Sequence, residues 1–241
     1  MKKIVLLLFS AVFVIYGFNS IPNYTKQELI GKIDPYTHKG FTKVKSRYTD
    51  RDIYLRKEVN RAFEKMAKAA TKDGINLYIL SGTRTYTRQS EIWEDKWNRF
   101  EGNPEEKARE ILRYSSMPGT SRHHWGTDFD LNSLEPEFFE TKSGEKIYSW
   151  LESQAWKFGF FQPYNKLGDN RKRGYKEEKW HWSYYPTASQ LLRAYNNLIE
   201  YQDILGFEGA ELGDSLDVFD HYVNAIYIPK NLEFQQIRNQ P

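Results

Sequence analysis

The chain has 241 residues, a formal net charge of +3 and no cysteine. This length suits one domain that buries a full hydrophobic core. The absence of cysteine excludes a thiol nucleophile, a disulfide scaffold and a thiolate-ligated metal, so any metal must be held by histidine or carboxylate side chains. The balance is only mildly basic, and no basic stripe is interleaved with stacking aromatic residues, so the sequence predicts no nucleic-acid partner.

The N-terminal stretch is typical of an export signal. Lys2 and Lys3 precede an apolar run over residues 4–18. This run is shorter than the roughly 20 residues of a comfortable membrane span, and no clear small-residue cleavage site follows it. We therefore expect residues 1–20 to be a signal peptide, or an anchor that holds the chain to the cytoplasmic membrane through residues 4–18. Either reading places the protein in the periplasm or cell envelope.

The remaining chain is predicted to be an α+β domain. Apolar residues at a spacing of three to four predict helices, whereas β-rich or alternating stretches predict strands. Helices are expected over residues 55–73, 92–100, 104–114, 145–158 and 188–204, and strands over 75–80, 128–131 and 179–185. Helices grouped at both ends of a few strands indicate a small, mostly antiparallel sheet with flanking helices, and not alternating βαβ units.

The expected domain organisation has three parts after the signal. Residues 21–54 contain several glycines and prolines and are expected to be an extended lead-in. Residues 55–200 are expected to form the functional domain, with its metal site on the sheet. Residues 201–241 are expected to be a C-terminal appendage.

Two short segments about fifty positions apart carry the side chains of a metal hydrolase. The segment Ser-Arg-His-His-Trp-Gly-Thr-Asp-Phe-Asp supplies His123 and Asp130, and the segment Glu-Lys-Trp-His supplies Glu178 and His181. A zinc hydrolase needs three protein ligands, an open position for water and a base. We expect His123, Asp130 and His181 to be the ligands. Glu178 is the expected general base, which later protonates the leaving amine.

The local geometry leaves two questions. Gly126 allows a tight turn, so that His123 can face Asp130, but the adjacent His124 is a competing ligand. Residues 178 and 181 would point to opposite sides of a flat strand, so a bulge or the end of the strand must bring both to the metal. Trp180 is expected to pack in the core beneath the site.

These blocks resemble the zinc D-alanyl-D-alanine carboxypeptidases and dipeptidases of the vancomycin-resistance type, peptidase family M15. The pattern Ser-x-His-x-x-Gly-x-x-x-Asp is followed by Glu-x-Trp-His, as in that family. Residues 81–86 with Gln89 resemble the family's Ser-Gly-Tyr-Arg-Ser segment, and Pro-Gly-Thr precedes the first metal block. The resemblance covers roughly residues 55–186, with its three blocks in the family's order.

The resemblance implies roles for further residues. His123, Asp130 and His181 would bind zinc, with Glu178 as the catalytic base; these four are the residues already singled out. Arg84 would bind the substrate carboxylate or steady the oxyanion, in keeping with the bidentate grip of arginine on carboxylates. Ser121 and Gln89 would be lesser substrate contacts.

The chain also departs from the family's pattern. Asp128 stands where the family usually has a small apolar residue. It shares a strand face with Asp130, so we expect it to orient a ligand or enter the outer shell of the metal. Thr83 replaces the usual tyrosine, which leaves the detail of the substrate pocket open.

The sequence therefore predicts an exported zinc peptidase. The residues alone indicate metal-assisted hydrolysis of a peptide-like bond, and the resemblance supplies the substrate, a peptidoglycan stem peptide or another D-Ala-ended peptide. The alternatives are a D-Ala-D-Ala dipeptidase, an L,D-carboxypeptidase, or a non-catalytic zinc-containing wall-binding module. Glu178 favours an enzyme, because a binding module needs no base at that position. The sequence leaves open the native metal and the oligomeric state.

Overall fold

The computed structural model describes residues 24–232. The predicted signal or anchor over residues 1–20 lies outside the described residues. Within residues 24–232, none of the helices combines the length and apolar character that crossing a membrane requires.

A four-stranded antiparallel sheet lies at the centre of the fold, and its strand order is β3-β4-β6-β5. Its strands are β3 (Ile79–Ser81), β4 (Asp128–Leu131), β5 (Phe160–Phe161) and β6 (His181–Tyr184). A separate antiparallel hairpin is formed by β1 (Phe41–Lys43) and β2 (Tyr54–Arg56). This arrangement confirms the predicted α+β class with a small antiparallel sheet.

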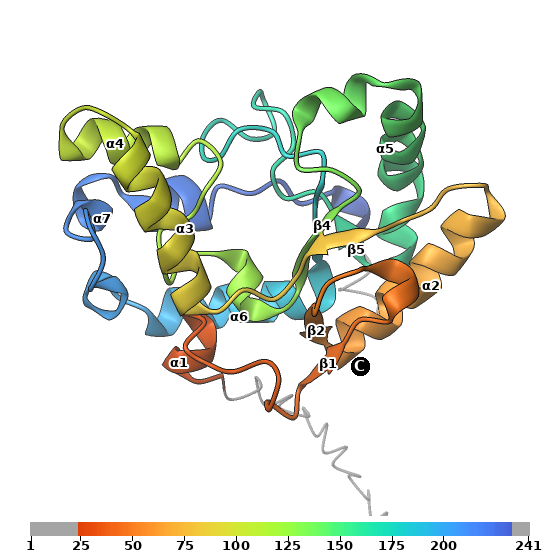
Figure 1. Ribbon diagram of the computed structural model, residues 1–241, viewed down its shortest axis with the longest axis horizontal. Helices are drawn as coiled ribbons and strands as arrows, with labels where there is room; N and C mark the ends of the chain where they lie inside the picture. The colour runs from red at the N-terminus through yellow and green to blue at the C-terminus, as the bar shows by residue number, and fades with distance from the viewer. Residues whose placement is uncertain (1–23, 233–241) are drawn as a thin grey trace, which may run out of the picture.

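Helices flank the sheet on two sides. They are α1 (Lys26–Leu29), α2 (Lys57–Lys72), α3 (Tyr86–Arg99), α4 (Pro104–Ile111), α5 (Lys142–Gln154), α6 (Tyr185–Leu198) and α7 (Leu212–Ser215). Figure 1 shows α3 and α4 on one side of β4 and β5, and α2 and α5 on the other. Short 3-10 turns connect the main elements, among them Arg122–Trp125 before β4.

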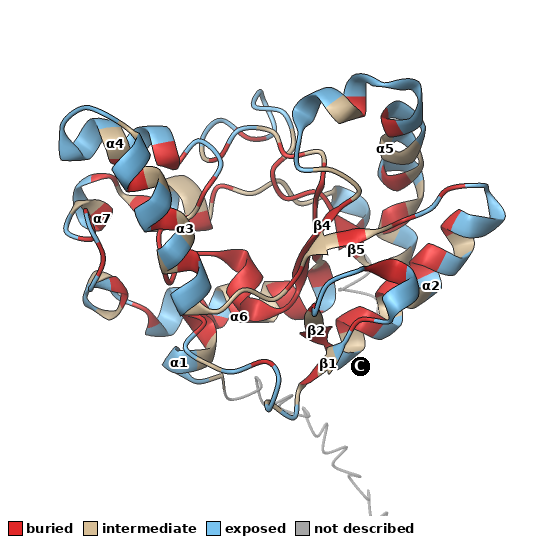
Figure 2. Cartoon of the chain, viewed as in Figure 1, coloured by how far each residue is buried: buried red, intermediate tan, exposed pale blue. Residues whose placement is uncertain are grey.

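The core forms where helix stripes meet the inner face of the sheet. Helix α2 buries Val59, Phe63, Met66 and Ala70, whose three- to four-residue spacing places them on one face. Phe63 packs edge-on against Phe129 of β4, with ring centroids 5.2 Å apart. Figure 2 shows this division, with buried residues along the central strands and exposed residues on the outer faces of α2 and α4.

The segments on either side of the expected domain are integral to it. From the N-terminal side, the Leu29 carbonyl accepts a 3.0 Å hydrogen bond from the buried Trp125 indole. From the C-terminal side, Phe207 and Val218 join the hydrophobic cluster around Trp93. Residues 24–54 therefore contribute buried contacts to the domain and are not only an extended lead-in. Residues 201–232 contribute side chains to its core and do not form a separate appendage.

Candidate metal centre and active site

Strands β4 and β6 bring two of the predicted ligands face to face. Asp130 is the cross-strand partner of His181 in the antiparallel register, and Asp128 is the partner of Ser183. Side chains alternate along a strand, so Phe129 enters the core while Asp128 and Asp130 share the opposite face. The predicted alternation of β4 thus places its two carboxylates on the site side of the sheet.

His123 reaches the same place through a reversal of the chain. It lies in the 3-10 turn Arg122–Trp125, which ends at Gly126 in the left-handed conformation, with φ of +68°. A Cβ at Gly126 would also lie 2.3 Å from a ring carbon of Phe41, so glycine is required on two grounds. His123 Nε2 then lies 3.4 Å from Asp130 Oδ2, which confirms the predicted bend.

Glu178 and His181 share a side because β6 begins only at His181. The residues before it form a turn in which the His181 amide donates a 3.2 Å hydrogen bond to the Glu178 carbonyl. Glu178 Oε2 consequently lies 3.5 Å from His181 Nδ1. Trp180 is buried, as expected, but it lines the cavity wall and packs against the ring of Tyr114 instead of lying beneath the site.

The free nitrogens of the two imidazoles point at Asp130. His123 Nδ1 lies 2.8 Å from the Gly82 carbonyl, and His181 Nε2 lies 3.0 Å from Asp128. If these nitrogens carry the protons, His123 Nε2 and His181 Nδ1 present lone pairs to the site. One ligand atom from each of His123, Asp130 and His181 can be chosen so that all lie within 4.8 Å of one another.

The donor set fits a tetrahedral metal. Ligand atoms about 2.0–2.1 Å from a tetrahedral zinc are roughly 3.3 Å apart. His123 Nε2 and Asp130 Oδ2 are separated by 3.4 Å, and His181 Nδ1 and Asp130 Oδ1 by 3.2 Å. Although it is buried, Asp130 Oδ1 accepts no hydrogen bond from the described residues. A carboxylate oxygen and an imidazole lone pair that face each other in this way suit a cation between them.

Asp128 holds His181 from the outer side. Its Oδ2 accepts a 2.9 Å hydrogen bond from Arg122 Nε, and its Oδ1 accepts hydrogen bonds from Thr127 and Ser183. All of these groups are buried. An imidazole whose second nitrogen meets a well-anchored carboxylate is the usual outer shell of a histidine-ligated metal.

Burial and charge shift the protonation of the cluster. Burial raises the pKa of Glu178 to about 8, and Asp130 adds to this effect. Burial alone would lower the pKa of His181, but its contacts with Asp128 and Asp130 raise that pKa to about 9. Burial alone would raise the pKa of Asp130, yet His123 and His181 hold that pKa well below the ordinary value. Burial and charge thus favour the protonated forms of Glu178 and His181 and the ionised form of Asp130.

Arg84 lies beside the ligands and is held by other side chains. Its Nη1 donates a 2.8 Å hydrogen bond to Gln89 Oε1, and its Nη2 donates one of 3.1 Å to Ser81. Nη2 is also 3.8 Å from Asp130 Oδ2. Gln89 is completely buried, and its amide nitrogen donates a 2.6 Å hydrogen bond to the Ser116 carbonyl. Gln89 therefore contacts Arg84 from behind.

The competing ligand His124 points elsewhere. Its Nδ1 lies 2.7 Å from the Arg84 carbonyl, and its Nε2 accepts a 3.1 Å hydrogen bond from the Gly119 amide. Burial lowers the pKa of His124 to about 3, so the ring is neutral. His124 supports the backbone on both sides of the site instead of joining the metal cluster.

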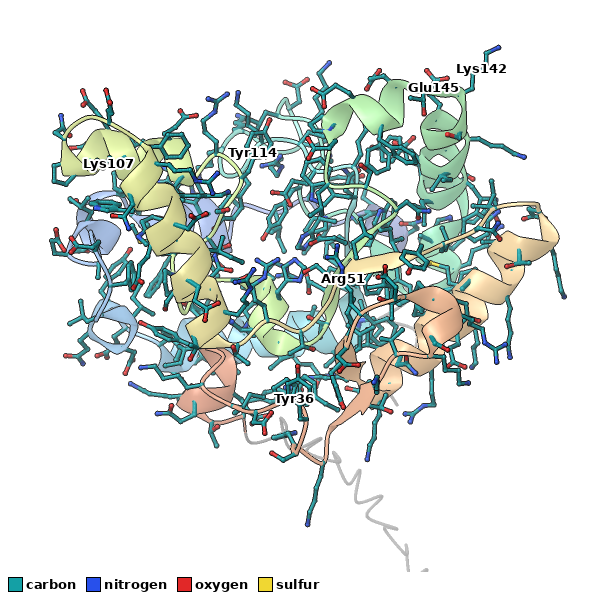
Figure 3. The ribbon with its side chains drawn as sticks, in the orientation of Figure 1. Tyr36, Arg51, Lys107, Tyr114, Lys142 and Glu145 are labelled. Carbon is teal, nitrogen blue, oxygen red and sulfur yellow. The ribbon has the colours of Figure 1, made fainter. Side chains whose placement is uncertain are left out.

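A cavity of about 420 Å³ opens over the metal cluster. Its wall includes Arg84, Ser121, Glu178 and all three candidate ligands. The wall also contains groups that the motifs do not single out, notably Lys96 of α3, Tyr114 and Ser115. Tyr114 lies between α4 and α5 in the view of Figure 3. The turn after α4 therefore adds its own side chains to the site.

Comparison with known proteins identifies the family of the chain. Residues 52–187 match the VanY family, described as D-alanyl-D-alanine carboxypeptidase. The putative carboxypeptidase YodJ of Bacillus subtilis is 34% identical over 137 residues, which are 54% of this chain and 46% of that protein. A D-alanyl-D-alanine carboxypeptidase of Enterococcus faecium is 26% identical over 196 residues, 77% of this chain and 58% of that protein. The chain thus spans about half the length of these relatives.

A solved structure shares the fold. The LdcB LD-carboxypeptidase superimposes with a TM-score of 0.52 at 24% identity, and the match covers 70% of this chain and 80% of that one.

Proposed function

Because the chain belongs to the VanY family of D-alanyl-D-alanine carboxypeptidases, we propose that it is a zinc metallo-carboxypeptidase that removes the terminal D-alanine from peptidoglycan stem peptides. The observation that carries this proposal is the convergence of His123, Asp130 and His181 at the base of a cavity, with Glu178 3.5 Å from His181. The relative from Enterococcus faecium bears the name of the same activity.

His123 Nε2, Asp130 and His181 Nδ1 would hold the zinc ion, which acts when bound as a Lewis acid and acidifies a water molecule. Glu178 accepts the proton of the attacking water and then delivers it to the departing amine. Its burial supports this double role, because a raised pKa makes a carboxylate a better base and its acid form available near neutrality.

Arg84 acts at the scissile peptide bond. Its guanidinium lies 3.8 Å from the ligand Asp130 and lines the cavity, so it can stabilise negative charge that develops on the scissile carbonyl. Gln89 and Ser81 fix the guanidinium before substrate arrives, which reduces reorganisation during the reaction. Ser121 lines the same cavity and supplies a hydroxyl for the substrate.

We also propose that the protein works outside the cytoplasm. The basic start and the apolar run over residues 4–18 support this location. The proposed substrate belongs to the cell wall, which is consistent with export.

Incubation of the zinc-loaded protein with a stem pentapeptide ending in D-Ala-D-Ala tests the proposal, with products identified by mass spectrometry. We expect loss of one alanine, and we expect Glu178→Gln to abolish it while zinc remains bound. Glu177→Gln is the matched control, because Glu177 is adjacent but only partly buried and outside the cavity wall. Release of the dipeptide D-Ala-D-Ala would keep the mechanism but assign a different scissile bond. The same would follow if a stem tetrapeptide, tested alongside, were cleaved and the pentapeptide were not. Stoichiometric zinc without any cleavage would favour a wall-binding module.

A further inference from the structure

Helix α3 directs a second cation toward the cavity. Gln89, Ile92 and Lys96 follow one another at spacings of three and four, so they lie along one side of the helix. Gln89 holds Arg84, whereas Ile92 and Lys96 line the cavity itself. The adjoining side of α3, about a quarter of a turn away, buries Trp93 and Trp97 in the core. The helix is therefore fixed, and its cavity side has a defined orientation.

Among the described residues, Lys96 differs from Arg84 and Arg122 in having no carboxylate within ion-pair distance. Arg84 lies 3.8 Å from Asp130, and Arg122 donates to Asp128 at 2.9 Å. Lys96 Nζ donates a 2.5 Å hydrogen bond to Ser115 Oγ, but within residues 24–232 it forms no ion pair. Ser115 is itself buried and lines the cavity.

A partly buried, unpaired ammonium is unfavourable unless an anion joins it. Burial lowers the pKa of Lys96, and the carboxylate of Glu178 works in the opposite direction. Two of the three ammonium hydrogens are left after the bond to Ser115. The site is thus suited to an anionic group brought by the substrate.

Given the proposed function, on which this inference rests, we propose that Lys96 Nζ and Ser115 Oγ bind a carboxylate of the peptide substrate. Arg84 is less suited to this task, because its two terminal nitrogens already contact Gln89 and Ser81 and it lies beside the metal ligands. Lys96 leaves Arg84 to act at the scissile bond and adds a separate point of recognition.

The distances allow two sources for that carboxylate. Lys96 lies seven residues beyond Gln89, which is about 10 Å along a helix axis, and helical side chains tilt back toward the N-terminus. An extended peptide covers about 3.5 Å per residue. The carboxylate is therefore either the C-terminal one, just past the scissile bond, or an internal glutamyl carboxylate two or three residues away.

Two matched pairs of D-Ala-D-Ala peptides distinguish these sources. One pair differs at the C-terminus, carboxylate against carboxamide. The other keeps the terminal carboxylate and differs at an internal glutamyl residue, free carboxylate against carboxamide. kcat and KM are measured for the zinc-loaded wild type, Lys96→Met, Lys96→Arg and Arg99→Met. Arg99 is exposed on the same helix and controls for the loss of one positive charge.

We expect the wild type to prefer the carboxylate in at least one pair, and Lys96→Met to lose that preference by about 10- to 100-fold, as for a charge-assisted hydrogen bond. The loss should appear mainly in KM, Lys96→Arg should restore part of it, and Arg99→Met should leave it unchanged. The pair that loses its preference identifies the carboxylate.

Retention of every preference by Lys96→Met, or no preference in the wild type, would overturn the proposal. If the wild type cleaves none of the peptides, the proposed function fails instead. The same comparison is then made by equilibrium binding of the peptides, where an unchanged carboxylate preference in Lys96→Met refutes the role of Lys96 and a lost one supports it.

Discussion

Asp128 and His181 are joined by a 3.0 Å contact between carboxylate Oδ2 and Nε2, while the other ring nitrogen of His181 lies 3.2 Å from Asp130 Oδ1. One imidazole is thus held between two carboxylates with different tasks. Asp128 is neutralised by Arg122 and by two hydroxyl donors, whereas Asp130 Oδ1 receives no hydrogen bond from the described residues. The first carboxylate orients the ring, and the second remains available to a metal.

Asp128→Asn should weaken zinc binding about 10- to 100-fold, the usual effect of losing an outer-shell partner. The amide can donate to Nε2 and thereby place the proton on Nδ1, which then cannot bind metal. Competition with a chromophoric chelator measures the affinity. Asp169→Asn, at an exposed loop position, is the control. Equal affinity of wild type and Asp128→Asn would contradict the assigned tautomer.

In the metal-free protein, the protonation of Glu178 should make the unfolding free energy depend on pH. Its folded pKa of about 8 exceeds its ordinary value of 4.5. Between these values the folded state holds a proton that the unfolded state has released, so the unfolding free energy falls as pH rises through this window. Glu178→Gln has no such proton and should lack this part of the slope.

Thermal unfolding of chelator-treated protein at about pH 5 and about pH 8.5 measures this difference. Between the lower and the higher pH, the unfolding free energy of Glu178→Gln should increase relative to that of the wild type by an amount on the order of a few kcal/mol. Glu177→Gln should follow the wild type, because no comparable burial affects it. A constant gap between Glu178→Gln and the wild type at both pH values would show that Glu178 is ionised in the folded apoprotein.

Gln89→Leu should lower kcat/KM by about tenfold or more while zinc affinity stays unchanged. The substitution removes the acceptor that fixes Arg84 Nη1 and leaves the Ser116 carbonyl without its donor. Steady-state kinetics and the same zinc competition separate the two effects. Gln202→Leu changes an exposed glutamine and should have normal kinetics. A normal kcat/KM in Gln89→Leu would mean that Arg84 is positioned without it.

Phe207→Ala should reduce the unfolding free energy by about 3 kcal/mol, as other large-to-small core changes do. The Phe207 ring packs edge-on against Trp93, with centroids 5.7 Å apart. Urea unfolding measures the change. Leu205→Ala, at a residue that is 51% exposed, should cost less than about 0.5 kcal/mol. Similar small effects of both substitutions would show that the C-terminal segment is a separate appendage after all.

The regular elements were predictable because their apolar spacing is strong. Helix α2 and strand β4 appear close to their expected bounds, since one buries a clear stripe and the other alternates. Helix α3 begins at Tyr86, ahead of the apolar face that predicted it from Ile92 onward, because the Thr85 side chain caps it through the Arg88 amide. The segment 201–232 folds in short turns whose apolar residues follow no single period, so its burial left no pattern in the sequence.

The metal cluster was predictable for a different reason. Its residue types are rare in a chain with five histidines, and Gly126 marks the bend that joins His123 to Asp130. Lys96 gave no comparable signal, because a lysine on a helix is normally solvated, and only the packing of α3 against the turn after α4 encloses it. The same holds for Gln89, whose burial behind Arg84 depends on contacts 27 residues away.

The contact between α3 and the C-terminal segment constrains the order in which parts of the chain can fold during synthesis. Trp93 donates a 2.8 Å hydrogen bond to the Glu208 carbonyl and packs on Phe207, so the side of α3 that carries Trp93 is covered only once that distant segment has been synthesised. A nascent chain can contain both metal motifs and still lack this support for the wall that carries Lys96. That wall can therefore gain its full packing support only after Phe207 and Glu208 have left the ribosome, late in the synthesis of the described chain.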